Sequence, residues 1–314
     1  MENLIFCLNA TVPIFLTMMA GLFFRKIGLF NESFITKMNQ FVFKVALPVL
    51  LFQDISGADF YEVWNGRFVL YCFVVTLTSI LLVTILSCFL KDHSLRGEFI
   101  QGSYRSSAAI LGIAFMQNIY GDAGMAPLMI IGSVPLYNMM AVIVLSIFGA
   151  EKKKIDAVLI KKTCKGILTN PIIIGIVIGL IWSVLRIPQP AIMERTVKNI
   201  AVLATPLGLI ALGGGFEIKK AANKISIAVV CSAIKLIVLP ALFLPIAIWI
   251  GFVQSELIAI LTMLGSATTV SSYVMAKNMG HEGTLSAAIV MMTTALSAFS
   301  LTGWLYLLKT LALI

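Results

Sequence analysis

Long apolar stretches alternate with short polar segments along the whole chain. Ten of these stretches reach roughly 20 residues, the length that an α-helix needs to cross the hydrocarbon core of a bilayer. They cover residues 5–24, 34–53, 67–90, 98–119, 124–149, 167–186, 198–216, 225–250, 256–277 and 284–308. The pattern predicts an all-α polytopic membrane protein with ten transmembrane helices.

The composition supports this fold class and excludes a soluble domain. Hydrophobic residues make up 60% of the 314 residues and charged residues only 12%, whereas soluble domains carry about one quarter charged residues. The five cysteines are scattered without the spacing of a metal site or a disulfide framework. We therefore expect no metal and no cofactor.

The distribution of basic residues predicts an orientation in the cell membrane. Loops after the odd-numbered spans hold fifteen lysines and arginines, and the other loops together with both termini hold five. Because loops rich in these residues stay in the cytoplasm, we expect both termini on the outer side. The same bias accounts for the net charge of +9, so nucleic acid is not an expected partner. Membrane lipid is an expected partner, and the basic run 152–154 is a candidate for contact with anionic lipid.

An offset of 158 or 159 residues aligns the two halves of the chain. The matched pairs include Pro13 with Pro171, Gly21 with Gly179, Pro48 with Pro206, Gly57 with Gly215, Asn65 with Asn223, and Ser107 with Ser266. Each half holds five spans, an odd number, so the second half lies upside down relative to the first. The sequence thus predicts a five-plus-five inverted repeat: a first repeat over 1–150, a cytoplasmic loop over 151–166 and a second repeat over 167–314.

Small and hydroxyl residues interrupt the fourth and ninth spans at positions that match under the repeat. Inverted repeats of secondary transporters place the substrate near the midplane, where broken helices of the two halves meet. We therefore expect helices 4 and 9 to be broken and to cross; tight packing of small residues without a ligand is the alternative. The candidate substrate-binding residues are Arg105, Ser106, Ser107, Ala108, Thr268, Thr269, Ser271 and Ser272, joined by Pro48 and Asn138.

Three charged side chains fall well inside spans, and all three are basic. A charge at this depth is costly unless it is paired or hydrated, so it indicates function. Arg105 is the main candidate for binding a carboxylate, since its guanidinium fork can engage both oxygens. The alternative is that span four begins later in the sequence, in which case the Arg105 side chain only extends toward the cytoplasm. Lys235 and Lys44 are candidates for charge compensation at helix breaks or for ion coupling, and Lys44 has a purely structural alternative beside Pro48.

The other polar residues refine this prediction. All acidic residues lie near span ends or in loops, so we expect no buried carboxylate and favour an anionic substrate. Asn138 lies near the middle of the fifth span, where an unpaired amide would be costly; it can serve either the pocket or helix packing. His93 and His281 fall in predicted cytoplasmic loops, where we expect solvation.

Local motifs resemble the auxin efflux carrier family, which includes plant PIN-FORMED carriers and bacterial malate-permease-like proteins. These motifs are 41–48 with Leu51-Phe52 in the second span, Gly112-Ile113 in the fourth, 205–213 in the seventh, Lys235 before Pro240 in the eighth and Ala276-Lys277 in the ninth. The resemblance covers the whole chain. It implies a secondary active or facilitative transporter that works by alternating access around crossed helices 4 and 9.

The chain departs from the family pattern at both breaks. Family members usually carry proline there, whereas this chain has Ser106 and Ser107 in the fourth span and Ala267 or Thr268 in the ninth. The third span also lacks the acidic residue of PIN-FORMED carriers, so auxin is a poor candidate. The resemblance implies a small organic anion, for example a dicarboxylate such as malate.

Two other classes remain as alternatives to an organic-anion carrier. A carrier of amino acids or other amino compounds would use the same fold. An intramembrane enzyme would need paired carboxylates or an HExxH motif inside the spans, and the sequence has neither. We therefore expect a transporter and no enzyme, with a second copy of the chain as a candidate partner.

Overall fold

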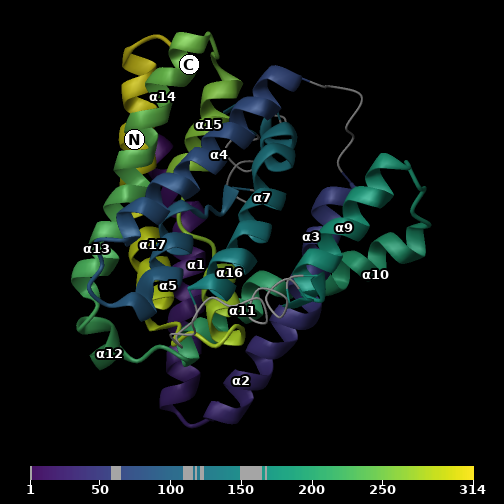
Figure 1. The fold of residues 1–314 in the computed structure, drawn as a ribbon, viewed down its shortest axis with the longest axis vertical. Coiled ribbons are helices and arrows are strands. Elements are labelled where there is room, and N and C mark those ends of the chain that lie inside the picture. Colours follow the sequence, from purple (N-terminus) through teal and green to yellow (C-terminus); the bar gives the residue numbers. More distant parts are fainter. Residues whose placement is uncertain are drawn as a thin grey trace.

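The computed structural model describes residues 2–57, 65–108, 116, 119–120, 124–148, 165–166 and 168–314. Every regular element within these ranges is a helix, and the helices gather into one bundle (Figure 1). The predicted all-α class is therefore confirmed. Residues 109–115 of the predicted fourth span, 149–150 at the end of the predicted first repeat and 151–164 of the predicted cytoplasmic loop lie outside the described residues.

Within the described ranges, six helical stretches are long and apolar enough to cross a membrane. They run over Glu32–Ser56, Gly66–Ser87, Ala126–Ile147, Ala191–Gly214, Ile225–Ile250 and Thr284–Thr310. Helix α1 (Glu2–Lys26) precedes them, and two apolar helices are shorter, α9 (Pro171–Val184) and α15 (Ser255–Gly265). The count of ten spans in an inverted repeat stays a prediction.

Asparagine side chains determine where several helices begin. Each accepts a hydrogen bond from a first-turn N–H group that has no partner inside its own helix. The helices are α2 (Glu32–Phe41), capped by Asn31, α4 (Gly66–Ser87), capped by Asn65, and α9, capped by Asn170.

Two membrane helices contain a π-helical turn that ends two residues before a proline. Turn η1 (Val42–Ala46) joins α2 to α3 (Leu47–Ser56), and turn η3 (Ile234–Val238) joins α13 (Ile225–Ala233) to α14 (Leu239–Ile250). Proline cannot donate to the carbonyl four residues earlier. For Pro240 this carbonyl belongs to Leu236, and it accepts instead from Trp304 Nε1 at 2.9 Å.

Two helix pairs approach each other closely at glycines. A Cβ atom on Gly213 of α11 (Ala204–Gly214) would lie 1.8 Å from Met18 O of α1, and one on Gly175 of α9 would lie 2.5 Å from Pro48 O of α3. Any larger residue would push these helices apart. In Figure 1, α3, α9 and α10 (Ala191–Ala201) form one side of the bundle, and α4, α13 and α15 lie on the other.

Helices α5 and α15 both end where the sequence predicts a break, and the chain after the first of these ends, residues 109–115, lies outside the described residues. Helix α5 (Arg96–Tyr104) ends at Arg105 with φ −70° and ψ 138°, and α15 ends at Ser266 with φ −75° and ψ 162°. The chain then resumes as α16 at Ser271. Ser107 N donates to Ala267 O at 2.9 Å, so the two breaks touch through their backbones without any proline.

The remaining elements frame these breaks. They are α7 (Ala126–Ile147), which lies next to α4, the short turn η2 (His93–Leu95) before α5, α12 (Ile218–Ala222) after α11, α16 (Ser271–Asn278), and the last helix α17 (Thr284–Thr310).

Candidate functional site

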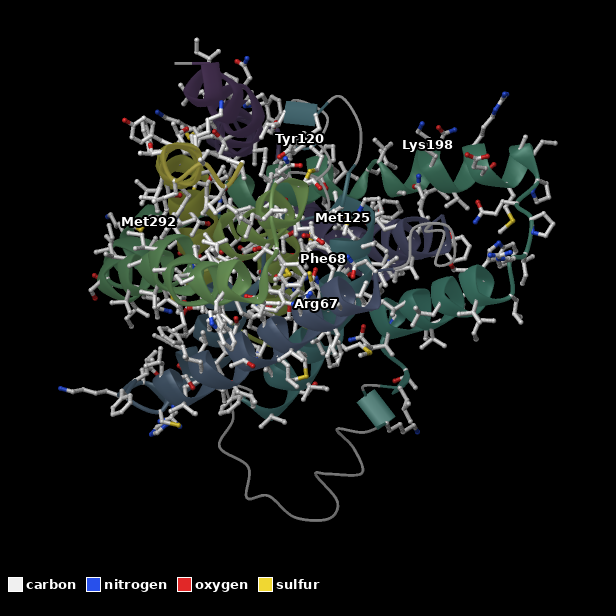
Figure 2. All side chains as sticks on the ribbon, turned by 90° about the horizontal axis from the view of Figure 1, so that it is seen from above. Arg67, Phe68, Tyr120, Met125, Lys198 and Met292 are labelled. Carbon is white, nitrogen blue, oxygen red and sulfur yellow. The ribbon has the colours of Figure 1, made fainter. Side chains whose placement is uncertain are left out.

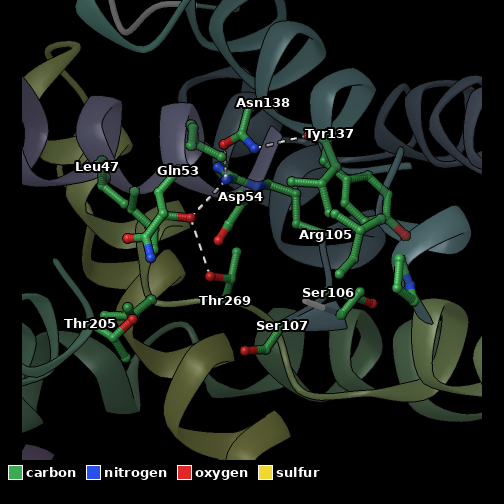
Figure 3. Close-up of a pocket in the computed structure, with 18 of the residues that line it drawn as sticks. Leu47, Gln53, Asp54, Arg105, Ser106, Ser107, Tyr137, Asn138, Thr205 and Thr269 are labelled. Atoms are coloured by element: carbon green, nitrogen blue, oxygen red, sulfur yellow. Dashed lines mark hydrogen bonds between the residues drawn. The ribbon is translucent and has the colours of Figure 1, made fainter. Parts of the chain in front are cut away.

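A cavity of about 550 Å³ lies between α3, α7 and the two breaks (Figure 3). Its volume is typical of a small-molecule site. Apolar side chains of α3 and α7 form part of the wall, among them Leu47, Leu50, Leu51, Ile130 and Val134. Seven of the predicted binding residues also line the cavity: Arg105, Ser106, Ser107, Ala108, Asn138, Thr269 and Ser271.

Arg105 opens the first break, and its side chain is only 1% exposed. Nη2 donates to Asn138 Oδ1 and to Ser271 Oγ, each at 2.7 Å, and Nη1 contacts the sulfur of Met275 at 2.8 Å. A guanidinium group has five N–H groups, and the buried Nε has no partner. Neutral side chains thus hold the cation in place while some of its donor capacity stays unused.

No carboxylate among the described residues forms an ion pair with Arg105. The ion pairs within the described ranges join Lys220 to Glu217 and Lys224 to Glu282, and none of these four residues lines the cavity. A buried charge is costly unless an opposite charge or good hydrogen bonds compensate it. An anionic ligand in the cavity would supply that compensation.

Lys235 lies behind the first break and is fully buried. Its Nζ donates to Ser106 Oγ, to Leu264 O and, at 3.3 Å, to Met263 O. The two carbonyls belong to the last turn of α15, where a helix carries partial negative charge. All three N–H groups of the ammonium have acceptors, and Lys235 does not line the cavity.

The second break contributes fewer residues to the cavity than the sequence predicts. Thr269 Oγ1 and Ser271 Oγ lie 3.2 Å apart at the cavity wall. Thr268 instead turns away from the cavity, and its Oγ1 donates to Gly102 O at 2.7 Å. Ser272 is buried nearby, and its carbonyl accepts from Gln101 Nε2 at 2.9 Å. Thr268 and Ser272 therefore bind α5 rather than face the cavity.

The structure also keeps Pro48 and Lys44 out of the cavity. Pro48 packs its backbone against Gly175, although its neighbour Leu47 lines the wall. Lys44 is exposed on the helix surface. The two lysines of the π turns thus differ in placement: only Lys235 is close to the breaks.

Four polar lining residues were missed by the sequence-based prediction, namely Gln53, Asp54, Tyr137 and Thr205. The second span was predicted to end at residue 53, whereas α3 extends to Ser56. Leu47, Leu50 and Asp54 follow each other at helical spacings of three and four, so they share one face. Extending that periodicity by one turn would have placed Asp54 in the cavity.

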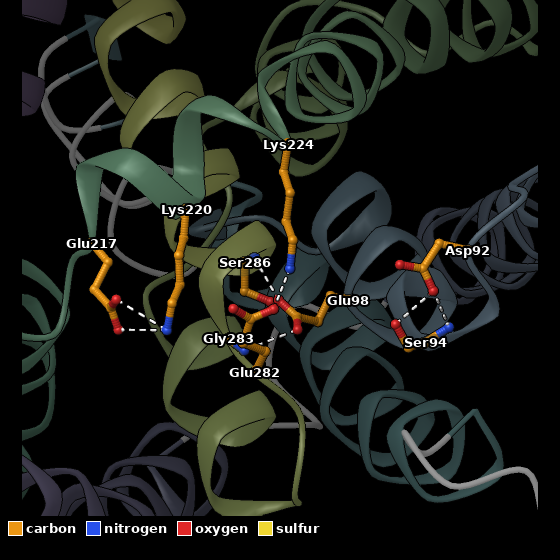
Figure 4. A network of polar contacts seen from close by, with 9 residues as sticks. All are labelled: Asp92, Ser94, Glu98, Glu217, Lys220, Lys224, Glu282, Gly283 and Ser286. Carbon is orange, nitrogen blue, oxygen red and sulfur yellow. Dashed lines mark hydrogen bonds and ion pairs between the residues drawn. The ribbon is translucent and has the colours of Figure 1, made fainter.

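At the opposite end of α5, a buried carboxylate joins this helix to the start of α17 (Figure 4). Glu98 is 1% exposed and accepts from Gly283 N at 2.9 Å and from Ser286 N at 2.7 Å. The expectation of no buried carboxylate is therefore wrong. The N–H groups at the positive end of α17 compensate the negative charge.

His281 is also buried, contrary to the expectation of a solvated loop histidine. Its ring is 5% exposed, and Nε2 lies 2.9 Å from Leu145 O. The ring fits because Gly97 has no side chain: a Cβ atom there would lie 2.8 Å from the ring. Beside it, Lys224 donates to Glu282 at the surface and lowers the pKa of that carboxyl (Figure 4).

Comparison with known protein families matches residues 6–305 to the family described as "Membrane transport protein". Among curated proteins, a similar one is the "Putative malonate transporter" of Rhizobium meliloti (strain 1021). It is 24% identical over 287 residues, and the match covers 88% of each chain. The family match includes every residue that lines the cavity.

Proposed function

Because the chain belongs to the membrane transport protein family, as its resemblance to the auxin efflux carriers implies, we propose that it carries a small organic anion across the cell membrane. The protein is a membrane transporter and not an enzyme. The observation that carries the anion proposal is Arg105, a buried cation at the cavity without a carboxylate partner among the described residues.

The surroundings of Arg105 favour a carboxylate over other anions of similar size. The guanidinium plane is fixed on one edge by Asn138 and Ser271, so it is pre-oriented and loses little entropy on binding. A carboxylate can accept from the unpartnered Nε–H group, and it gains the second, parallel N–H bond of the fork where it replaces Asn138 or Ser271 on Nη2. The name of the relative from Rhizobium meliloti, which refers to malonate, agrees with a dicarboxylate.

The packing supports the predicted inverted repeat and alternating access. Gly21 of α1 packs on α11, and Gly179 of α9 packs on α3, with hypothetical Cβ atoms 2.2 Å from Ile210 O and 3.2 Å from Phe52 O. Gly21 and Gly179 match under the sequence offset, so exchanging the two halves exchanges these helix pairs. A carrier with inverted halves binds its substrate where broken helices of the two halves meet, so two equivalent helix pairs beside two touching breaks agree with this architecture.

A carrier of amino acids is the second candidate, and a specific residue favours it. Asp54 lines the same cavity as Arg105. A zwitterion could direct its carboxylate to Arg105 and its ammonium group to Asp54. Dicarboxylates and amino acids are therefore the two ligand classes to compare directly.

The test is ligand binding by purified protein in detergent, measured as thermal stabilisation and followed by counterflow in liposomes. Malonate, malate and succinate should stabilise the wild type. Arg105→Gln should weaken this binding at least about 30-fold, since truncating one partner of a buried charge pair costs about 2 kcal/mol or more.

The matched control is Lys44→Gln, which removes the same charge from an exposed position outside the cavity. This variant should bind dicarboxylates like the wild type. If dicarboxylates do not stabilise the wild type, or if Arg105→Gln binds them unchanged, the organic-anion proposal is wrong.

A further inference from the structure

We propose that Asp54 binds a proton during transport, so that the protein moves a dicarboxylate together with one proton. The proposal rests on the proposed function and extends it, because it specifies the protonation state of the bound ligand. It also assigns a coupling role to a residue on the opposite wall of the cavity from the two breaks.

Asp54 and Arg105 are the charged residues that line the cavity within the described ranges. Asp54 comes from α3, whereas Arg105 comes from the break after α5. Among the described residues they do not form an ion pair with each other, and no side-chain hydrogen bond to the Asp54 carboxylate is found there (Figure 3). The cavity thus receives a cation from the break after α5 and an acid from α3.

A dicarboxylate that binds Arg105 through one end directs its second carboxyl group toward other parts of this cavity, where Asp54 is the acidic residue. Two carboxylates that share one site cannot both stay ionised without strong repulsion. One proton between them converts this repulsion into a charge-assisted O–H···O hydrogen bond, which is among the strongest in proteins. A second carboxylate that shares the cavity with Asp54 therefore favours binding with one proton.

No ion pair joins Asp54 to another charged group within the described residues. Helix α9, which packs against α3, and helix α11, which contributes Thr205 to the cavity, contain no charged residues. On α10, Glu194, Arg195 and Lys198 are exposed, and Lys198 projects away from the bundle (Figure 2). Lys44 of η1 is exposed as well, and the Tyr137 hydroxyl across the cavity donates to Met263 O at 3.0 Å. Within the described lining of the cavity, Arg105 is therefore the charged side chain that can act on Asp54 together with the ligand.

The transport cycle then balances as follows. On the first side, ionised Asp54 and a dianionic ligand take one proton from water into the hydrogen bond between them. On the other side the ligand leaves as a dianion and the proton returns to water. The empty protein goes back with Asp54 ionised, so each cycle moves one proton and one net negative charge.

Calorimetry measures directly how many protons are taken up when the ligand binds. Malonate binding to the full-length protein is measured at about pH 7.5 in two buffers with different ionisation heats, which gives the number of protons taken up. We expect one proton for the wild type and none for Asp54→Asn, whose amide can donate to the second carboxylate without a proton. The malonate Kd of the wild type should rise about tenfold per pH unit, as one linked proton requires, and that of Asp54→Asn should stay flat.

Two further variants make the result specific. Asp92→Asn removes an exposed carboxylate that does not line the cavity, and this variant should still take up one proton. Asp54→Glu restores an acid and should restore proton uptake, even if Asp54→Asn does not fold.

The outcomes separate the two proposals. Malonate binding to the wild type without proton uptake, or equal uptake by Asp54→Asn, overturns the role of Asp54 and leaves the organic-anion function intact. Binding of amino acids in place of dicarboxylates, lost in Asp54→Asn, also overturns it and points to a zwitterion. Absence of dicarboxylate binding to every variant contradicts the proposed function itself.

Discussion

Arg105 and Lys235 are both buried cations at the broken helices, yet their surroundings differ. The three N–H groups of Lys235 all meet oxygen acceptors, two of which are backbone carbonyls of α15. Arg105 has only side-chain partners, one of them the weak sulfur acceptor of Met275, and its Nε has none. The fold itself therefore satisfies Lys235, whereas Arg105 keeps donors that a ligand can use.

Ser106 links the two environments. It lines the cavity beside Arg105, while its hydroxyl accepts from Lys235 and donates to Met263 O. Arg105 and Lys235 therefore have different roles although they lie in one small region. Lys235 should determine the stability of the break, and Arg105 should determine ligand affinity.

The largest expected effect is the loss of stability in Lys235→Met. Leu264 O would lose the Lys235 ammonium that donates to it, and a buried carbonyl without a partner costs about 1–3 kcal/mol. With the lost charged hydrogen bonds we expect destabilisation of about 3 kcal/mol, seen as a lower Tm in detergent. Lys44→Met, at the exposed lysine of the other π turn, is the matched control and should change stability by less than about 1 kcal/mol.

The opposite outcome is a Lys235→Met variant that keeps the wild-type Tm but no longer binds malonate. Lys235 would then act on the ligand instead of the fold. Retention of malonate affinity within about threefold in the destabilised variant would sharpen the separation of the two roles.

Arg105→Lys should show the opposite pattern, with a loss of affinity and a small change in Tm. Lysine keeps the positive charge but lacks the planar fork, so it loses about one charge-assisted hydrogen bond, near 1.5 kcal/mol. This corresponds to roughly tenfold weaker malonate binding, which titration in the thermal-shift assay can measure. Equal affinity in wild type and Arg105→Lys would show that charge alone, and not the fork, binds the ligand.

Ser106→Ala should have a smaller effect on both quantities. The variant removes one acceptor from Lys235, but the two carbonyls of α15 remain, so we expect a loss of about 1 kcal/mol in stability. Malonate affinity should fall by less than about threefold. A larger loss of affinity than in Arg105→Lys would mean that the hydroxyl, rather than the guanidinium, is the main ligand contact.

Much of this arrangement could be predicted from sequence because the signals are local. The length of apolar runs gives the membrane helices, and hydroxyl residues inside such runs mark the breaks around Ser106 and Ser271. Seven of the predicted binding residues line one cavity for the same reason: they lie at the breaks or on the helix beside them.

The features that were missed depend on which face of a helix is buried and on contacts between residues far apart in sequence. Lys44 and Lys235 occupy similar π turns before proline, and only the packing of the whole bundle exposes one and buries the other. Glu98 is buried because α17 begins directly beside it, 185 residues away in sequence. Asp54 was missed through an error of three residues in a helix end, where periodicity is least informative.

The smallest expected effect comes from a third cation, Lys224, whose partner Glu282 is 44% exposed. Lys224 lowers the pKa of Glu282 from its ordinary value of 4.5, so this pair contributes stability above about pH 4.5 that is lost as the pH falls through the lowered pKa. Because water screens an exposed pair, Glu282→Gln should cost less than about 1 kcal/mol at pH 7. The wild-type and variant Tm values should converge as the solution is acidified. Glu282→Gln could instead lower the stability as much as Lys235→Met does. The exposed ion pair of Lys224 would then contribute as much stability as the buried contacts of Lys235, and burial would not explain the difference between the cations.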